Sequence, residues 1–341
     1  MSELQIHRNF SLRAFNTFNI DVLCSAFAQI PTIDALSAVL QHGELGAMPR
    51  LILGGGSNLL FTKDFDGLAL KVAIEGIYTL RENDDFVWVK AGAGERWHNL
   101  VLHCVENRWG GIENLSLIPG CVGAAPIQNI GAYGAELKEV FDSLEAVNLA
   151  SGKIEVFTNA QCRFGYRDSI FKNKLKDKYC IVSVTLCLHK HPLLNTQYGA
   201  IDHTLKEMGV AQPTLKTVSE AVCHIRRSKL PNPAVIGNAG SFFKNAEVDK
   251  EVFDVLHAHH PAMPHYRLTN GKVKIPAGWL IEQCGWKGKR NGQAGVHHRQ
   301  ALVLVNYGTA TGDEILSLAH NIQASVKKQF GIALMPEVNV V

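Results

Sequence analysis

A run of three glycines directly after an apolar strand is the feature that most restricts the fold of this 341-residue chain. Residues 50–53 read as a buried strand, and the segment 54–58, Gly-Gly-Gly-Ser-Asn, follows at once. Glycines let backbone N–H groups approach an anion, so the segment predicts either a phosphate cradle or a tight turn. The dinucleotide fingerprint Gly-x-Gly-x-x-Gly is excluded because Leu59 stands where its last glycine would be.

A second glycine-rich segment covers residues 118–134 and carries four glycines, two prolines and no charged residue. Such a stretch neither forms a helix nor gains much from solvation, so it is either a buried structural loop or a groove lined by backbone. A groove of this kind suits a large flat cofactor, whose rings need apolar walls and whose diphosphate needs N–H donors. Two such segments in one chain favour the cofactor.

Composition excludes several classes of partner. The 34 basic and 31 acidic residues are well mixed, which leaves a formal charge of +3 and no polybasic arm for nucleic acid. No apolar run approaches the roughly 18 residues that cross a bilayer, and the N-terminus lacks the apolar core of a signal peptide. We therefore expect a cytoplasmic protein without a membrane or nucleic-acid partner, and a monomer.

The cysteines and histidines predict no metal site. The eight cysteines never fall as Cys-x-x-Cys, and several lie in apolar stretches, so we expect small buried hydrophobic side chains. Fifteen histidines include a cluster at 257–260 and a pair at 297–298, but no His-Glu-x-x-His motif accompanies them.

Periodicity predicts alternating helices and strands. Expected strands cover 50–53, 68–74, 77–80, 86–90, 181–186 and 301–306, and expected helices cover 32–42, 95–107, 247–257 and 312–328. Residues 144–149 and 154–157 read as a hairpin. The Thr217-Val218-Ser219-Glu220 pattern predicts a capping box that starts a helix towards Arg227. Pro231 and Pro233 end that helix and mark the expected domain boundary.

Three further segments, together with the two glycine-rich ones, resemble UDP-N-acetylenolpyruvoylglucosamine reductases. They are Arg-Phe-Gly-Tyr-Arg-Asp-Ser-Ile-Phe-Lys at 163–172, Gly-Asn-Ala-Gly-Ser-Phe-Phe-Lys-Asn at 237–245 and Pro-Glu-Val at 336–338. The likeness runs in the family's order from Asn16-Thr17-Phe18 to Glu337. It also includes Tyr198, which looks like the tyrosine of the substrate-covering loop in the longer type of this family.

The resemblance implies an α+β protein with the vanillyl-alcohol-oxidase-like (PCMH-type) FAD-binding fold. That fold consists of two α/β subdomains, here expected at 1–70 (joined by the C-terminal strand 332–341) and 71–230, plus a third, substrate-binding α+β domain at 231–331. It also implies FAD held without a covalent bond and NADPH as co-substrate.

The family match also implies the site residues. FAD would contact Leu53, Gly54, Gly55, Gly56, Ser57, Asn58, Ile118, Pro119, Gly120, Cys121, Gly123, Gln128, Asn129, Gly131, Ala132, Tyr133 and Gly134. The UDP-sugar would contact Tyr198, Arg226, Lys229, Lys244, Asn245 and Gln300, although members vary around Arg227 and Ser228. The catalytic residues would be Arg167, Ser241 and Glu337.

The implied reaction is the NADPH-dependent reduction of UDP-N-acetylglucosamine enolpyruvate to UDP-N-acetylmuramate in peptidoglycan precursor synthesis. Arg167 would hold the carboxylate, Ser241 would pass on a proton, and Glu337 would either donate a hydrogen bond or orient Arg167. From the residues alone, each has a structural interpretation: an ion pair of Arg167 with Asp168, an ordinary turn serine and a solvated glutamate. Two other functions stay open, a flavin-dependent sugar-alcohol or lactone oxidase of the same superfamily and a non-enzymatic binding protein.

Overall fold

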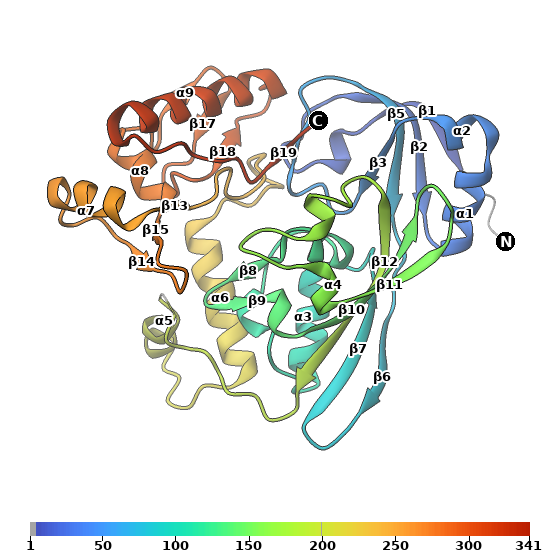
Figure 1. Ribbon diagram of the computed structural model, residues 1–341, viewed down its shortest axis with the longest axis horizontal. Helices are drawn as coiled ribbons and strands as arrows, with labels where there is room; N and C mark the ends of the chain where they lie inside the picture. The colour runs from blue at the N-terminus through green and yellow to red at the C-terminus, as the bar shows by residue number, and fades with distance from the viewer. Residues whose placement is uncertain (1–4, 199) are drawn as a thin grey trace. The chain divides into compact units, whose positions relative to one another are not determined.

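The computed structural model describes residues 5–198 and 200–341, which form two compact units (Figure 1). The first unit contains the chain up to Ser11, Leu23–Gly56 and Phe65–Ser228. The second contains Leu12–Val22, Ser57–Asp64 and Lys229–Val341. Each unit is therefore assembled from segments far apart in the sequence, and the first glycine segment crosses from one unit into the other after Gly56.

The first unit contains a four-stranded sheet in the order β1-β2-β5-β3. β1 (Ile6–Ser11) runs antiparallel to β2 (Leu23–Ile30), while β5 (Phe65–Val72) pairs in parallel with both β2 and β3 (Arg50–Leu53). Between β2 and β3 lie α1 (Ile33–Gln41) and α2 (Gly43–Ala47). The Thr32 side chain accepts the Ala35 N–H at 3.1 Å, which caps α1 and confirms the helix expected from 32.

A five-stranded antiparallel sheet completes the framework of the first unit. Its order is β11 (Ile154–Thr158), β10 (Phe141–Asn148), β12 (Tyr179–His189), β7 (Phe86–Gly92) and β6 (Ile77–Glu82). The expected hairpin is confirmed as β10 and β11. Ser183 of β12 and Lys90 of β7 both donate to the carboxylate of Glu145 on β10. One apolar core packs against both sheets.

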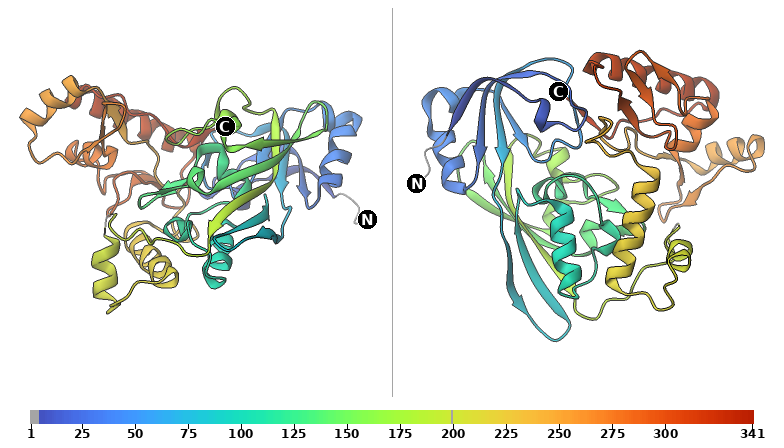
Figure 2. Two further views of the ribbon diagram at one scale, coloured as in Figure 1. Left: turned by 60° about the horizontal axis from the view of Figure 1, so that its bottom comes forward. Right: turned by 180° about the vertical axis from the view of Figure 1, so that it is seen from behind.

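The remaining elements of the first unit include those that the second glycine segment itself forms. They are α3 (Trp97–Glu106), α4 (Asn159–Cys162), α5 (Ile201–Glu207), α6 (Leu215–Lys229), β8 (Gly131–Ala132) and β9 (Ala135–Glu136), with 3-10 turns at Glu113–Leu115, Val122–Ala124, Pro126–Gln128, Leu137–Glu139 and Ile170–Lys172. Helices α3 and α6 lie side by side (Figure 2).

The helix expected from Thr217 begins earlier, so the predicted capping box is wrong. α6 starts at Leu215, and the reciprocal cap is made by Thr214 and Thr217, each of which accepts the other's backbone N–H at 3.2 and 2.8 Å. A threonine at the third position thus takes the place usually held by Glu or Gln. The helix stops at Lys229, ahead of Pro231 and Pro233 as predicted.

The second unit consists of small sheets and three helices. Its strands are β4 (Leu59–Leu60), β13 (Ala246–Val248), β14 (Tyr266–Arg267), β15 (Val273–Ile275), β16 (Arg290–Asn291), β17 (Ala294–Val296), β18 (Leu304–Asn306) and β19 (Asn339–Val340), and its helices are α7 (Lys250–His259), α8 (Ala277–Gln283), α9 (Gly312–Phe330) and the 3-10 turn Arg13–Phe15. The antiparallel sheets have the orders β13-β15-β14 and β16-β17-β18, and β4 pairs in parallel with β19.

Two expectations for the second unit need correction. The segment that was expected to be helical from Glu247 starts as β13, because Ala246–Val248 pairs with β15, and the helix begins only at Lys250. The strand expected from Ala301 begins at Leu304, after a turn in which the Val303 N–H bonds to the Gln300 carbonyl. The helix expected at 312–328 is confirmed, with Thr311 and Glu314 forming its capping box.

Six of the eight cysteines are buried, as expected for small apolar side chains. Within the described part of the chain, no helix has the length and apolar character of a membrane span. The division into three domains stays a prediction.

Asn306 is the polar centre of the second unit, and its side chain is 3% exposed. Its amide oxygen accepts the N–H groups of Gly308 and Ala310 at 2.8 and 2.9 Å, and its amide nitrogen donates to the Phe18 carbonyl at 2.9 Å. These bonds join the Leu12–Val22 segment to β18.

We expect Asn306→Ala to lower the free energy of unfolding of the second unit by about 2–3 kcal/mol, because it leaves buried backbone groups without partners. Urea denaturation followed by circular dichroism measures this loss. The control is Asn321→Ala on the exposed side of α9, for which we expect a change within about 0.5 kcal/mol. Equal losses in the two variants would contradict the role of Asn306.

Candidate functional site

The two glycine-rich segments meet in the first unit. A Cβ atom on Gly55 would lie 2.7 Å from the Gly120 Cα, a distance that real Cβ atoms do not reach. A Cβ on Gly54 would lie 3.7 Å from the Cys121 Cβ. The end of β3 therefore lies directly against the start of segment 118–134, and only glycine at position 55 permits this approach.

Unused backbone donors gather at this junction. Within residues 5–198 and 200–341, the N–H groups of Gly54, Gly55, Ile118 and Gly120 donate to no protein acceptor. Converging N–H groups without partners are the donor set that holds phosphate in glycine-rich loops. The junction therefore suits the diphosphate of a dinucleotide, and the assignment of these residues to the cofactor stays a prediction.

The middle of segment 118–134 is held by Asn129, which is fully buried and has a φ of 43°. Its amide nitrogen donates to the Gly165 carbonyl at 3.0 Å and to the Glu136 carboxylate at 3.2 Å, and its amide oxygen accepts the Lys138 N–H at 3.0 Å. Asn129 was predicted to contact the cofactor, but the contacts of its side chain are with the protein. Those contacts shape the segment.

Arg167 lies against the same segment. Its guanidinium donates to the Gly131 carbonyl, and its Nη1 would be 2.9 Å from a Cβ at that glycine. The neighbouring acid, Asp168, accepts a hydrogen bond from Asn173 at 2.8 Å. The backbone of Arg167 has a φ of 51°, a left-handed conformation that is unusual for arginine.

Arg226 contacts both ends of the segment from α6. Its Nε donates to the Leu117 carbonyl at 3.2 Å, and its guanidinium hydrogen-bonds the Tyr133 hydroxyl. Burial lowers the pKa of Arg226, and repulsion by the nearby Arg167 acts in the same direction, whereas Tyr133 opposes it. Two guanidinium groups close enough to repel each other form a positive site that suits a carboxylate.

Tyr198 lies beside the far end of the segment. A Cβ on Gly134 would be 3.1 Å from the Tyr198 Cβ, and the Asn195 side chain donates to the Gly134 carbonyl at 3.2 Å. Asn114 secures the arrangement, because its amide nitrogen donates to the carbonyls of Tyr133 and Asn195, both at 2.9 Å.

In the second unit, the chain segments that carry Ser241 and Glu337 pair with each other. The Glu337 N–H donates to the Phe242 carbonyl at 2.8 Å, so Glu337 pairs with the residue next to Ser241. The Lys244 N–H donates to the Met335 carbonyl at 2.9 Å, which continues the pairing. Ser241 and Glu337 are both half-buried, and Phe242 and Phe243 anchor the strand in the core.

Asn58, from the first glycine segment, contacts the chain segment that carries Glu337. Its side-chain nitrogen donates to the Glu337 carbonyl at 3.2 Å, and its own carbonyl accepts the Asn339 N–H at 3.0 Å. The Ser-Asn end of the predicted cofactor loop is thus tied to the chain segment that carries Glu337.

The predicted substrate-binding residues of the second unit already have structural contacts. The Asn245 side chain accepts the Ala277 N–H at 3.1 Å at the start of α8, and the Gln300 side chain accepts the Leu302 N–H at 3.4 Å. Lys229 is exposed at the end of α6, and Lys244 is half-buried. The role of these four residues stays a prediction.

Sequence reasoning missed Lys71. This residue pairs with Leu53 across β5 and β3, and its ammonium lies 3.9 Å from the Cys121 Sγ, beside the junction of the two glycine segments. The available signal was a single cation in the otherwise apolar stretch 68–72. Burial raises the pKa of the Cys121 thiol, although Lys71 and Arg96 act in the opposite direction.

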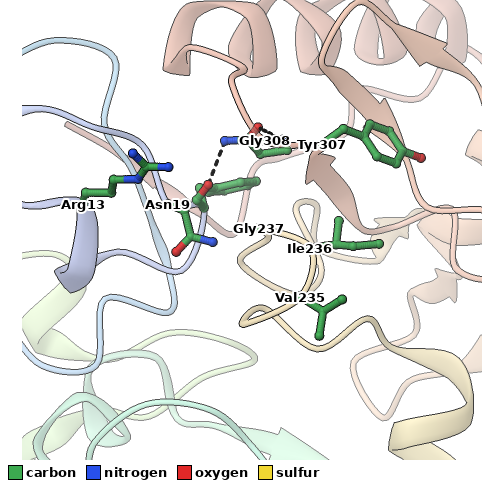
Figure 3. Close-up of a pocket in the computed structure, with 9 residues that line it drawn as sticks. Arg13, Asn19, Val235, Ile236, Gly237, Tyr307 and Gly308 are labelled. Atoms are coloured by element: carbon green, nitrogen blue, oxygen red, sulfur yellow. Dashed lines mark hydrogen bonds between the residues drawn. The ribbon is translucent and has the colours of Figure 1, made fainter.

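A separate cavity of about 330 Å³ in the second unit contains none of the predicted site residues in its lining (Figure 3). It lies between the loop of Arg13 and Asn19, residues 235–237 and the turn at Tyr307 and Gly308. Among the described residues, no group of three or more His, Cys, Asp or Glu side chains is arranged to bind a metal ion.

Comparison with known families agrees with this geometry. Residues 24–158 match the FAD binding domain family, and residues 232–341 match the family described as UDP-N-acetylenolpyruvoylglucosamine reductase, C-terminal domain. The first match covers both glycine segments, so the protein binds FAD, as predicted.

Relatives and solved structures extend the comparison to the whole chain. UDP-N-acetylenolpyruvoylglucosamine reductase from Flavobacterium johnsoniae is 49% identical over 99% of this chain and 100% of its own length, and that from Chromobacterium violaceum is 50% identical over 98% of each. The crystal structure of the reductase from Thermus caldophilus superimposes with a TM-score of 0.68 at 22% identity, covering 99% of this chain and 98% of that one. A solvent-stable cholesterol oxidase shares the fold with a TM-score of 0.51 at 12% identity, covering 99% and 87%.

These likenesses confirm the vanillyl-alcohol-oxidase-like α+β fold predicted from the sequence. The chain belongs to the UDP-N-acetylenolpyruvoylglucosamine reductase family of FAD-dependent oxidoreductases.

Proposed function

We propose that this protein reduces UDP-N-acetylglucosamine enolpyruvate to UDP-N-acetylmuramate with NADPH, through a non-covalently bound FAD, as a cytoplasmic step of peptidoglycan precursor synthesis. Relatives named UDP-N-acetylenolpyruvoylglucosamine reductase, which match this chain over nearly their full length, support the reaction class. The observation that supports the catalytic part is the hydrogen bond from the Glu337 N–H to the Phe242 carbonyl, which pairs the segment of the predicted acid with the segment of the predicted proton donor, Ser241.

The N–H groups of Gly54, Gly55, Ile118 and Gly120 would hold the diphosphate of FAD. When bound, FAD accepts hydride from NADPH and supplies it to the enolpyruvyl group. Neither glycine segment contains a histidine that could attach the flavin, and burial keeps the Cys121 thiol protonated by raising its pKa. Both features support non-covalent binding.

Arg167 would bind the carboxylate of the enolpyruvyl group. Its planar donor fork strengthens its hold as negative charge builds on that carboxylate, so it stabilises the transition state more than the bound substrate. The nearby Arg226 adds a second positive charge on the same side. The contact with the Gly131 carbonyl orients the Arg167 guanidinium before the substrate arrives.

Ser241 would deliver the proton that completes the reduction at the carbon next to the carboxylate. A serine hydroxyl is a weak acid, so it serves only when its position is fixed, and the buried Phe242 and Phe243 supply that fixation. Glu337 would donate a hydrogen bond to the enol if protonated, or orient Arg167 if ionised.

The remaining predicted residues would bind the UDP group and the NADPH phosphates. Lys229 and Lys244 carry positive charge, and Asn245 and Gln300 offer amide groups, all suited to an anionic ligand. Tyr198, beside Gly134, would cover the bound substrate. We further propose that the protein acts as a monomer without a nucleic-acid or membrane partner.

Gly55→Ala tests the cofactor site. The added Cβ would force the Gly120 backbone away, so we expect the purified variant to retain less than about a tenth of the wild-type FAD. Flavin absorbance per polypeptide measures this. Gly43→Ala is the matched control because no atom lies within 4 Å of its added Cβ, and it should retain full FAD content. Normal flavin content in Gly55→Ala would remove the junction from the binding site.

Ser241→Ala tests the proton donor. We expect NADPH to bleach the flavin normally, while anaerobic reoxidation by the enolpyruvyl substrate slows by about 10²–10⁴-fold. Stopped-flow absorbance separates the two half-reactions. Ser325→Ala, a serine on α9, is the control and should reoxidise at the wild-type rate. Unchanged reoxidation of Ser241→Ala would exclude the serine from catalysis.

The same apparatus tests the oxidase alternative. Reduced wild-type enzyme is mixed either with oxygen or with the UDP-sugar, and faster reoxidation by oxygen would favour an oxidase over the proposed reductase.

Glu337→Gln tests the acid. The substitution keeps the size of the side chain and the backbone bond to Phe242, so FAD content should stay within about 20% of wild type while the second half-reaction slows at least about tenfold. Glu251→Gln, at an exposed position of α7, serves as control. Wild-type turnover in Glu337→Gln would leave the carboxylate without a catalytic role.

A further inference from the structure

Leu117, the residue immediately before the second glycine segment, has a φ of 57°. For a residue with a branched side chain, this left-handed conformation costs about 1–2 kcal/mol, so surrounding contacts must hold it. It sets the direction in which the chain enters Ile118 and the unused N–H groups at the junction.

Both backbone polar groups of Leu117 are held by side chains from the two adjacent helices. Its N–H donates to the Nδ1 of His98 on α3 at 3.0 Å, and its carbonyl accepts the Nε of Arg226 on α6 at 3.2 Å. The two helices touch beside this point, where the His98 Nε2 lies 3.9 Å from the Cys223 Sγ of α6. The Ser116 hydroxyl, just before Leu117, also hydrogen-bonds the Ser219 hydroxyl of α6 at 2.7 Å. Figure 2 shows α3 and α6 next to each other.

From these contacts we infer that His98 is a positioning residue for the flavin site: its neutral imidazole holds Leu117 in the left-handed turn from which the FAD-binding segment starts. The inference deepens the proposed function, because it rests on segment 118–134 as the flavin-binding segment. Arg226 also holds this segment, because it contacts Leu117 just before its start and Tyr133 at its far end.

The hydrogen bond fixes the protonation state of His98. Nδ1 accepts the hydrogen bond of the Leu117 N–H only when it carries no proton itself, so the proton of the neutral ring is on Nε2, facing Cys223. Burial lowers the pKa of His98, and the charges of Arg227 and Arg226 lower it further. These two arginines are the charged groups that act on the ring, and Cys223 is the titratable group in contact with it. All three lie on α6.

Protonation of His98 would turn its attraction to the Leu117 N–H into repulsion. An imidazolium would present N–H to N–H at Leu117 and add a third positive charge beside the two arginines. Because the folded pKa lies below the ordinary value of about 6.5, the stabilising bond is fully present above that pH and is lost as pH falls through the folded pKa. FAD affinity should fall over the same range.

The experiment measures FAD dissociation constants of the full-length apo-protein by quenching of flavin fluorescence, between pH 7.5 and pH 5. We expect His98→Leu to weaken binding at pH 7.5 by at least about tenfold, because the Leu117 N–H loses its acceptor. His98→Asn offers an amide oxygen at the position of Nδ1 and should bind FAD within about threefold of wild type. Wild-type affinity should decline towards pH 5, whereas that of His98→Asn should not.

His42→Leu is the matched control. His42 Nδ1 accepts the Leu45 N–H at 3.3 Å at the start of α2, so the variant loses the same kind of bond elsewhere in the first unit. Its FAD affinity should remain at the wild-type value. Equal weakening in His42→Leu and His98→Leu would reduce the role of His98 to general stability.

The remaining outcomes are also decisive. Equal weakening in His98→Leu and His98→Asn, or identical pH profiles for wild type and His98→Asn, would overturn the inference. If His98→Leu does not fold, the comparison of wild type with His98→Asn across pH still decides. Wild-type protein that binds no FAD would instead refute the proposed function, so the two failures are distinguishable.

Discussion

The close approach of Gly55 to Gly120 is the constraint on which the cofactor site of the first unit depends. Neither backbone can withdraw easily. β3 is paired with β5 up to Leu53, and the Gly120 carbonyl accepts the Trp97 N–H at 3.0 Å at the start of α3. Two rigid elements therefore force two glycine backbones together, and their N–H groups are left for a ligand. At Gly55, the space that a side chain would need is already filled by the Gly120 backbone.

Four left-handed residues other than glycine lie in, next to or against the second glycine segment. Leu117, Asn129, Tyr133 and Arg167 all have positive φ angles, and each is held by a partner distant in the sequence: His98 and Arg226, Gly165, Asn114, and Gly131, respectively. Strain of this kind persists only where surrounding contacts determine the backbone, and it is commonly found at functional sites. In these backbone conformations, the Arg167 guanidinium contacts the Gly131 carbonyl and the Tyr133 hydroxyl contacts Arg226. The two guanidinium groups therefore lie near each other.

The second unit positions its chemistry differently. Ser241 and Glu337 lie on short paired segments that owe their stability to the buried Phe242 and Phe243 rather than to long strands. Asn58 adds a tie from the end of the first glycine segment to the Glu337 carbonyl. A serine hydroxyl needs a fixed position to act as a proton donor, and the two buried aromatic rings that follow Ser241 anchor its segment.

Local patterns in the sequence determined much of the fold. β3, α1, the β10–β11 hairpin and α9 follow from periodicity and turn chemistry, and the likeness to the reductase family followed from five motifs. The predicted start of α6 was wrong because both Thr214 and Thr217 are residues that can cap a helix. Only the folded chain selects between them. The roles of His98, Lys71 and Asn114 were undetectable, since each acts on a backbone or side-chain atom many residues away. Periodicity reports which side of an element is buried. The close approach of Gly55 to Gly120 and the hydrogen bond of Glu337 to Phe242 depend on how the elements pack, which no local pattern records.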